Sequence, residues 1–261
     1  MSLKKLETEI AKLNTKLEGM TDELVDTMDK YQNEYERLLR NKNFDLKNGN
    51  LKSTIANYNK AQSMSPMQKL GFNDLALSHV KQYTPLAKEQ IIWNKRLGIS
   101  VDLDFKDLKI LRRMQSMDFS LFQMEASLLD ERIKRELVNA IALEMPYQQT
   151  VSNLSSSLLG AGPKSGSLAG YANTYMRTAL FSLTKAVDQE IYDTLGIDEY
   201  LYAGPVDAKT REFCIRRVNK VFTREQIEEF GSENGGGLNG FLMPGSYNCR
   251  HRMSPLEIVE A

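Results

Sequence analysis

The sequence predicts a mainly α-helical fold, with a helical body, a coiled-coil-like helix at the amino end and a small irregular α+β module at the carboxyl end. Two observations lead to this prediction. Apolar residues recur at helical spacing over most of residues 1–196, whereas residues 197–261 combine short apolar runs, glycine-rich loops and both cysteines. Of the 261 residues, 41% are hydrophobic and 26% charged, which is enough apolar material for a core.

The first 40 residues carry the clearest periodic pattern. One apolar seam follows alternating spacings of three and four: Leu3, Leu6, Ile10, Leu13, Leu17, Met20 and Leu24. The flanking charges are not complementary, so self-association stays open. Packing on the chain itself is favoured, because Leu51, Ile55 and Tyr58 offer a second stripe. We assign residues 1–45 to this helix, and the polar break at 41–50 suggests that residues 1–40 can be removed without unfolding the rest.

The helical body is assigned to residues 46–196. A helix is expected to start at Ser65-Pro66 and to continue to residue 97, with interruptions near 71–73 and at Thr84-Pro85. Residues 104–144 form one or two helices that end near Pro146, and 147–159 form another. The glycine-rich stretch 160–170 is expected to be a flexible connector. A last helix over 171–195 ends at the cap residue Gly196.

The carboxyl-terminal module, residues 197–261, has a different pattern. Residues 200–202 and 220–222 are expected to form short strands, followed by a helix over 224–230 that is capped by Thr223. The loop 231–240 is too rich in glycine for regular structure.

Charge and cysteine content narrow the functional classes. Basic and acidic residues number 34 each, so the chain lacks the basic excess of a protein that coats nucleic acid. We find neither the apolar run of a secretory signal nor the roughly 20 apolar residues needed to cross a bilayer. Two cysteines do not make a disulfide scaffold. We therefore expect an intracellular protein, without a membrane partner, whose thiols are free or metal-bound.

Three clusters stand out in order along the module: 204–214 (GPVDAKTREFC), 221–227 (VFTREQI) and 247–255 (YNCRHRMSP). Together they resemble the carboxyl-terminal domain of the phage head morphogenesis family, the Mu F-like minor head proteins. That family's pattern is D-x-x-T-R-x-x-H/C, then an apolar turn element, then C-R-C/H before a proline. The matching residues are Asp207, Thr210, Arg211, Cys214, Cys249, Arg250, His251 and Pro255, and Arg177-Thr178 resembles the family's Arg-Thr helix.

The resemblance covers about residues 171–255 and has two departures. Cys214 stands where many members carry histidine, and Ile215-Arg216-Arg217 follow in place of the family's glycine. From the residue types, Asp207 is expected to form a turn or a helix cap, and Arg211 a two-pronged bond to a carboxylate.

The resemblance implies a phage minor head protein that assembles rather than catalyses. It implies portal and capsid proteins as partners, and a place in the virion, inside the capsid or at the portal vertex, after assembly in the bacterial cytoplasm. A link to DNA packaging or delivery would need a local contact. A basic run could supply such a contact, although a solvated face is the simpler interpretation of it. The run consists of Lys209, Arg211, Arg216, Arg217, Lys220 and Arg224, with Arg250 and Arg252.

Cys214, Cys249 and His251 leave several alternatives open. Their side chains suit zinc, but a closed zinc site takes four ligands, and spacing does not select Asp207 or His79 as the fourth. A nucleophilic cysteine with His251 as base lacks an orienting group. We favour a packed, hydrogen-bonded cluster and assign no cofactor and no catalytic residue. The alternatives are a zinc- or thiol-dependent enzyme or toxin, and a coiled-coil scaffold or adaptor.

A module of some 60 residues has a marginal core and usually needs an additional tie. The three side chains that can form one are those of Cys214, Cys249 and His251. They are therefore expected to lie near one another.

Overall fold

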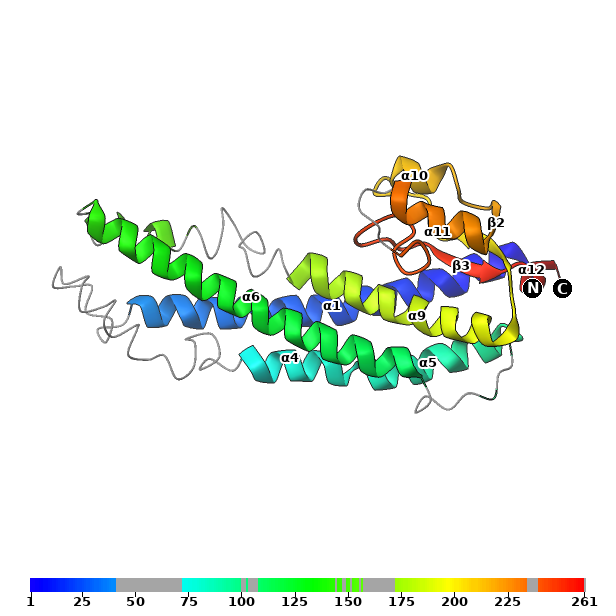
Figure 1. Ribbon diagram of the computed structural model, residues 1–261, viewed down its shortest axis with the longest axis horizontal. Coiled ribbons are helices and arrows are strands. Elements are labelled where there is room, and N and C mark those ends of the chain that lie inside the picture. Colours follow the sequence, from blue (N-terminus) through cyan, green and yellow to red (C-terminus); the bar gives the residue numbers. More distant parts are fainter. Residues whose placement is uncertain are drawn as a thin grey trace. The chain divides into compact units, whose positions relative to one another are not determined.

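The computed structural model describes residues 1–40, 72–99, 108–143, 172–233 and 239–260, with a few positions between 102 and 156. The described chain is mainly helical and has a small three-stranded antiparallel sheet near its carboxyl end (Figure 1), which confirms the predicted fold class. It divides into two compact units. Unit 1 combines Met1–Thr21, Lys81–Ser116 and Thr174–Ala261, and unit 2 combines Asp22–Val80 and Met117–Asn173.

These units cut across the three segments assigned from the sequence. The expected amino-terminal helix is α1 (Leu3–Arg40), and residues of both units belong to it. The run at 104–144 is one continuous helix, α6 (Lys109–Ala142), which also contributes to both units. Among the described helices, none is long and apolar enough to cross a membrane.

The core of unit 1 includes the first half of α1. Leu6, Ile10 and Leu17 are buried among apolar residues of α5 (Tyr83–Arg96), α9 (Arg177–Leu195) and the sheet. Helix α5 packs against α9. The apolar seam of α1 thus packs on its own chain, as favoured from the sequence. The burial of these side chains argues against the expectation that residues 1–40 can be removed, because part of the core would be removed with them.

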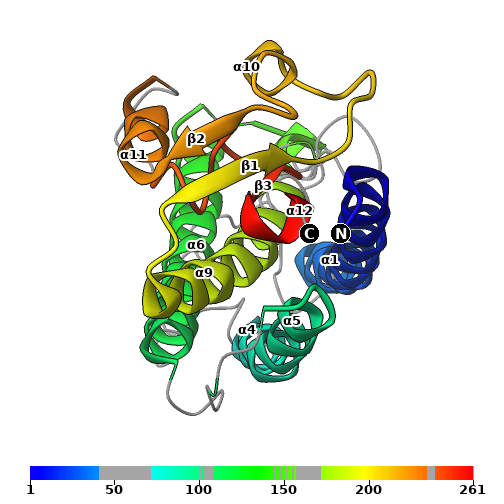
Figure 2. The same ribbon diagram turned by 90° about the vertical axis from the view of Figure 1, so that its right-hand side faces the viewer.

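The sheet has the order β2-β1-β3, with β1 (Glu199–Ala203) in the centre. Strand β2 (Val221–Thr223) pairs antiparallel with β1, placing Tyr200 opposite Phe222. Strand β3 (Arg252–Pro255) pairs with the other edge of β1, and Figure 2 shows β1 between its two neighbours. The sequence predicted β1 and β2 but not β3. Helix α11 (Arg224–Glu233) follows β2 directly and packs against it.

The remaining elements of unit 1 position the ends of the module. A π-helical turn, η3 (Ala172–Met176), leads into α9, which ends at Gly196 with the expected left-handed φ of 68°. The short helix α10 (Glu212–Ile215) lies between β1 and β2 in sequence, and the short helix α12 (Glu257–Glu260) follows β3. The two chain ends lie side by side, since the Met1 amino group donates to the carbonyl of Ile258 at 2.5 Å (Figure 1).

Unit 2 is formed by helices alone among its described residues. It contains most of α4 (Phe72–Lys81), the second part of α1 and most of α6. Its buried side chains include Val25, Leu75, Phe122 and Leu137. His79 is also fully buried, and its ring packs edge-on against Phe122 with centroids 5.1 Å apart.

The predicted interruption at Thr84-Pro85 is found two residues earlier, where α4 ends at Lys81 and α5 begins at Tyr83. Thr84-Pro85 lies in the first turn of α5, where a proline removes no intrahelical hydrogen bond. One helix end differs from the prediction. Helix α11 continues through Gly231 to Glu233. The predicted break at 41–50, the second stripe at 51–58, the start at Ser65-Pro66, most of 147–159 and the connector at 160–170 lie outside the described residues.

Candidate functional site

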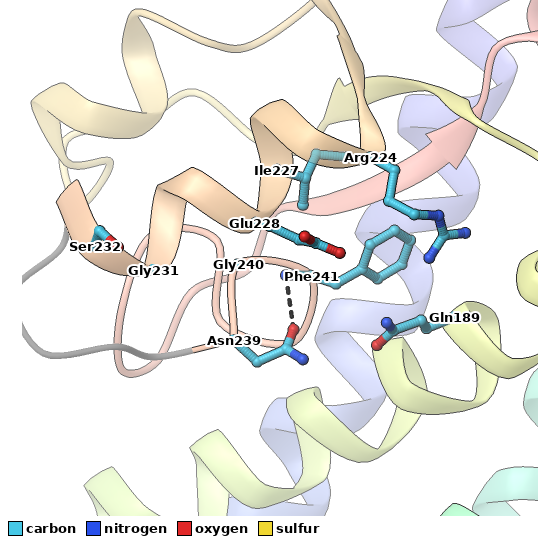
Figure 3. Close-up of a pocket in the computed structure, with 9 residues that line it drawn as sticks. All are labelled: Gln189, Arg224, Ile227, Glu228, Gly231, Ser232, Asn239, Gly240 and Phe241. Carbon is cyan, nitrogen blue, oxygen red and sulfur yellow. Dashed lines mark hydrogen bonds between the residues drawn. The ribbon is translucent and has the colours of Figure 1, made fainter.

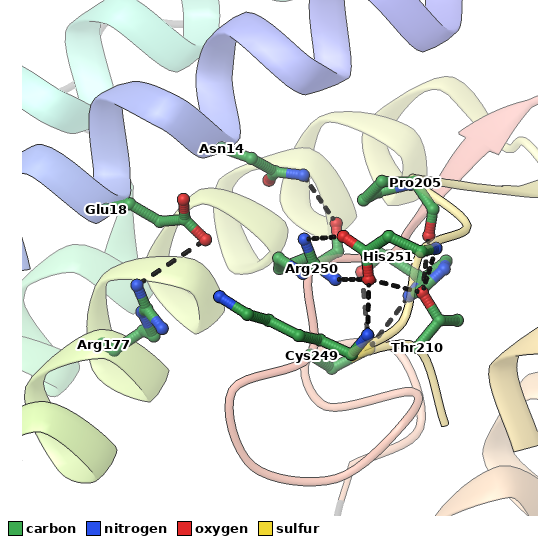
Figure 4. A network of polar contacts seen from close by, with 10 residues as sticks. Asn14, Glu18, Arg177, Pro205, Thr210, Cys249, Arg250 and His251 are labelled. Atoms are coloured by element: carbon green, nitrogen blue, oxygen red, sulfur yellow. Dashed lines mark hydrogen bonds and ion pairs between the residues drawn. The ribbon is translucent and has the colours of Figure 1, made fainter. Parts of the chain in front are cut away.

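The residues of the family pattern lie in unit 1, where α9, the segment before α10 and the loop before β3 are joined by polar contacts (Figure 4). Asp207 and Arg250 form the strongest of these contacts. The two guanidinium nitrogens of Arg250 donate to the two carboxylate oxygens of Asp207 at 2.7 and 2.6 Å. Such a two-pronged pair restricts geometry as well as supplying charge. The hydrogen bonds from Arg250 hold the pKa of Asp207 well below its usual range.

Asp207 also forms the predicted turn. Its carboxylate accepts from the backbone N–H of Lys209 at 2.9 Å and from the hydroxyl of Thr210 at 3.1 Å. The backbone N–H of Asp207 donates to the Thr210 hydroxyl in return, at 2.9 Å. Asp and Thr side chains commonly stabilise turns in this way. The turn presents the Asp207 carboxylate to Arg250.

Arg211 joins the same segment to the loop before β3. Its guanidinium donates to the carbonyl oxygens of Gly245 at 2.6 Å and Tyr247 at 2.7 Å. The sequence suggested a carboxylate partner for this arginine, and that suggestion is wrong. The carboxylate pair is made by Arg250, and Arg211 instead satisfies two loop carbonyls, which have no sheet partners to bond with.

Arg177 and Thr178 connect helix α9 to the site. The Thr178 hydroxyl accepts from the backbone N–H of Asn248 at 3.0 Å, and Asn248 has a left-handed φ of 58°. Arg177 forms an ion pair with Glu18 of α1 at 3.6 Å. Asn14 of α1 donates to the carbonyl of Arg250 at 3.1 Å. Helix α1 therefore contributes to the site, which the sequence did not indicate.

Cys214, Cys249 and His251 lie together, as expected from the sequence. Their ligand atoms are all within 4.8 Å of one another, and the three side chains are buried. The Cys249 sulfur is 3.8 Å from Nδ1 of His251, and both cysteines are free thiols. The hydrogen bond between the two sulfurs, together with burial, raises the pKa of Cys214, and the same bond lowers the pKa of Cys249.

Two side chains around this cluster were not singled out in the sequence. The Tyr202 hydroxyl lies 3.3 Å from the Cys214 sulfur and 4.0 Å from the Cys249 sulfur, and its ring stacks on His251 with centroids 5.3 Å apart. Lys185 of α9 donates to the Cys249 carbonyl at 2.7 Å. Burial lowers the pKa of Lys185 to about 8. A lysine in the middle of an apolar helix was the signal that could have identified it.

Backbone passes unusually close to the cluster at two glycines. A Cβ atom at Gly245 would lie 2.5 Å from the Cys214 sulfur and 2.8 Å from the Cys249 sulfur. A Cβ atom at Gly204 would lie 2.6 Å from the His251 ring. Both positions therefore need glycine for space, and the cluster is enclosed by backbone as well as by side chains.

The two candidates for a fourth ligand are placed elsewhere. Asp207 is bound to Arg250, and His79 is a buried residue of unit 2. Pro255, the last residue of the family pattern, ends β3 opposite Tyr200 and so has a place in the sheet. Proline is tolerated there because β3 is an edge strand.

A second buried polar cluster lies beneath β3 and has no counterpart in the sequence prediction. Asp188 of α9 accepts from Arg252 at 2.5 Å, from Gln90 at 2.6 Å and from Asn94 at 2.7 Å. The Arg252 guanidinium also lies over the ring of Trp93, 4.5 Å from its centroid. Burial raises the pKa of Asp188. Trp93, a buried residue of the core, is therefore also in contact with a buried charge network.

A pocket of about 430 Å³ lies between α9, α11 and the loop at 239–241 (Figure 3). Its lining includes Gln189, Arg224, Glu228, Asn239 and Phe241. It contains none of the residues predicted to form the site. The Asn239 side chain accepts from the backbone N–H of Phe241 at 2.9 Å and shapes the loop at the pocket wall.

Most arginines of the predicted basic run have partners within the chain. Arg217 forms an ion pair with Glu233 and lies over the Phe213 ring, and Arg224 forms an ion pair with Asp193 at 2.6 Å. Arg216 lies 3.7 Å from Glu212, and both side chains are exposed. The run is therefore largely a set of structural contacts.

No family model, curated protein or solved structure matches this chain.

Proposed function

We propose that this chain is a phage minor head protein of the Mu F-like kind, which acts by assembly with portal and capsid proteins. One observation carries the proposal. Residues matching the family pattern bind one another or the same loop across up to 70 positions of the chain: Thr178 binds Asn248, Asp207 binds Arg250, and Arg211 binds Gly245 and Tyr247. Such contacts are expected where the residues of a sequence pattern define one folded module. The surface of a module of this kind is then available to partners.

The burial of the thiols argues against the enzyme alternative. Cys214, Cys249 and His251 are 1%, 4% and 2% exposed, so the described residues keep these side chains almost entirely out of contact with solvent. Nε2 of His251 has no hydrogen-bond partner among the described residues, so no third group orients the ring as in a nucleophile–base–acid triad. These observations favour a structural role for the cluster.

The scaffold alternative depends on the apolar seam of α1 being available to another chain. Leu6, Ile10 and Leu17 of that seam are buried within unit 1, so the first half of α1 has no apolar seam left for a partner helix. A dimer through this part of the helix would require unit 1 to open.

The structure of the basic run makes protein a better-supported partner than DNA. Arg211, Arg217, Arg224, Arg250 and Arg252 each bind carbonyl oxygens or carboxylates of the same chain. Neutralised arginines contribute little to the phosphate contacts that dominate DNA affinity. We therefore place the main assembly contacts with portal or capsid proteins.

The test is a binding experiment with the portal protein encoded by the same phage genome. We expect the two purified proteins to form one complex in sedimentation velocity. Arg211→Ala removes the two bonds to the loop before β3 and should weaken this complex at least about tenfold, while circular dichroism confirms retained helix content. Arg216→Ala, an arginine of the same segment with an exposed side chain, is the matched control and should bind like the wild type. If the chain forms a complex with neither the portal protein nor the major capsid protein, the proposal is contradicted.

A further inference from the structure

Cys214, Cys249 and His251 form the one group of three metal-binding side chains found among the described residues. The group brings together α10 and the segment directly before β3, which are separated in sequence by β2, α11 and a loop rich in glycine. Two thiolates and an imidazole are the donor set typical of zinc, and they exclude the oxygen-preferring ions magnesium and calcium.

The distances in the group agree with a tetrahedral metal site. Zinc bonds of about 2.3 Å to sulfur and about 2.05 Å to nitrogen, at the tetrahedral angle, separate the two ligand atoms by about 3.6 Å. The Cys249 sulfur and Nδ1 of His251 are 3.8 Å apart, which is close to this value. Both cysteines are free thiols, so no disulfide explains their proximity.

Tyr202 lies at the fourth corner of this arrangement. For a metal–oxygen bond of about 2.0 Å, the same geometry predicts an oxygen-to-sulfur distance of about 3.5 Å. The Tyr202 hydroxyl is 3.3 Å from one sulfur and 4.0 Å from the other, on either side of that value. The phenol is therefore placed to complete the site, either at the metal or as a hydrogen-bond donor to the Cys214 sulfur.

Enclosure and position suit a structural metal rather than a catalytic one. The three ligands are buried, and the backbone at Gly245 is packed against both sulfur atoms. A bound divalent cation would balance the charge of two thiolates, which are costly to bury without a partner. It would also tie α10 to β3 in a module whose own core is small.

We propose that Cys214, Cys249 and His251 bind one structural zinc ion, with Tyr202 as the positioning residue at the fourth corner. Binding transfers the remaining thiol protons to solvent and involves no oxidation or reduction. The proposal goes beyond the proposed function and does not rest on it, because the ion would be bound whether or not the chain assembles with a portal.

The test uses the full chain, purified under reducing conditions. We expect one equivalent of zinc per chain by elemental analysis. Replacement of zinc by cobalt should produce the thiolate charge-transfer band and the intense visible bands of tetrahedral coordination. A wild-type chain that takes up no zinc and gives no such cobalt spectrum would overturn the proposal.

Variants assign the ligands. Cys214→Ser and Cys249→Ser should each abolish the tetrahedral cobalt spectrum, whereas His79→Gln should retain it because the other histidine lies in unit 2. Tyr202→Phe should weaken metal affinity by about 10- to 100-fold without changing the stoichiometry. An unchanged spectrum in both serine variants would place the metal elsewhere and would also overturn the proposal.

Discussion

At the scale of single residues, the Asp207–Arg250 pair shows how the module holds its shape. Asp207 sits in a turn that depends on its own carboxylate, and Arg250 lies between the two ligand residues Cys249 and His251. Loosening this pair should therefore disturb both the turn and the cysteine cluster.

Asp207→Asn should lower the melting temperature of the chain at pH 7, because the two-pronged ion pair with Arg250 is lost. The folded-state pKa of Asp207 is depressed, so its contribution is present above the unfolded pKa of 3.8 and is lost as the pH falls below that value. The difference between wild type and variant should therefore shrink below about pH 4. Glu212→Gln, at an exposed and weakly paired carboxylate, is the control. A difference that persists undiminished at pH 2.5 would speak against the ion pair.

Gly245→Ala should destabilise unit 1 by about 1–3 kcal/mol, since the new Cβ would overlap two buried sulfur atoms. Gly19→Ala is the matched control. A Cβ at Gly19 meets nothing within 4 Å and lies within α1, so this change should be neutral or stabilise by about 0.5–1 kcal/mol. Chemical denaturation monitored by the fluorescence of Trp93 measures both. Equal effects of the two substitutions would refute the close packing at the cluster.

His79 should make unit 2 sensitive to acid. Burial lowers its pKa to about 4 from 6.5, so the unfolded state takes up the proton more readily and stability falls as the pH drops through this interval. The expected loss between pH 7 and pH 5 is about 2 kcal/mol. An NMR titration of the imidazole carbon reports the pKa directly, and His79→Gln should remove the dependence. A His79 resonance that titrates near pH 6.5 would contradict this account.

At the scale of elements, the helices were predicted well because their apolar periodicity is local. The strand β3 was missed, since Arg252 and Pro255 are unusual strand residues and the strand exists through pairing with β1, about 50 residues earlier. Local patterns do not contain such long-range information.

The same distinction applies to the candidate site. The sequence identified Cys214, Cys249 and His251, because their donor types are rare in this chain. It did not identify Tyr202 or Gly245, since their roles come from spatial proximity to those sulfurs rather than from spacing. Buried Lys185 and Asp188, three positions apart on α9, were detectable as charges in an apolar helix.

The first half of helix α1 should behave as part of unit 1 rather than as a detachable extension. Leu17→Ala removes a side chain that is 1% exposed and should cost about 2–5 kcal/mol in unfolding free energy. Leu128→Ala in α6, where the side chain is 45% exposed, should cost less than about 1 kcal/mol. Denaturant unfolding of the two variants measures the contrast. Similar small losses for both would mean that α1 can be removed after all.

At the scale of the whole molecule, several charged groups of the described residues hold the fold of the chain itself. Arg252 with Asp188, Arg250 with Asp207 and Arg217 with Glu233 are all intramolecular pairs. The balanced total of 34 basic and 34 acidic residues agrees with this use. Such a protein is suited to defined protein contacts in an assembly, in agreement with the proposed place at the portal or inside the capsid.

The most direct test of the proposed assembly role is quantitative mass spectrometry of purified virions of the phage that, according to the proposal, encodes the chain. The account predicts that the chain is present in purified particles at a low and constant number of copies relative to the portal protein. It also predicts that particles produced without the chain are defective in head assembly or DNA delivery. Absence of the chain from infectious particles, together with normal particle formation when its gene is disrupted, would contradict the account.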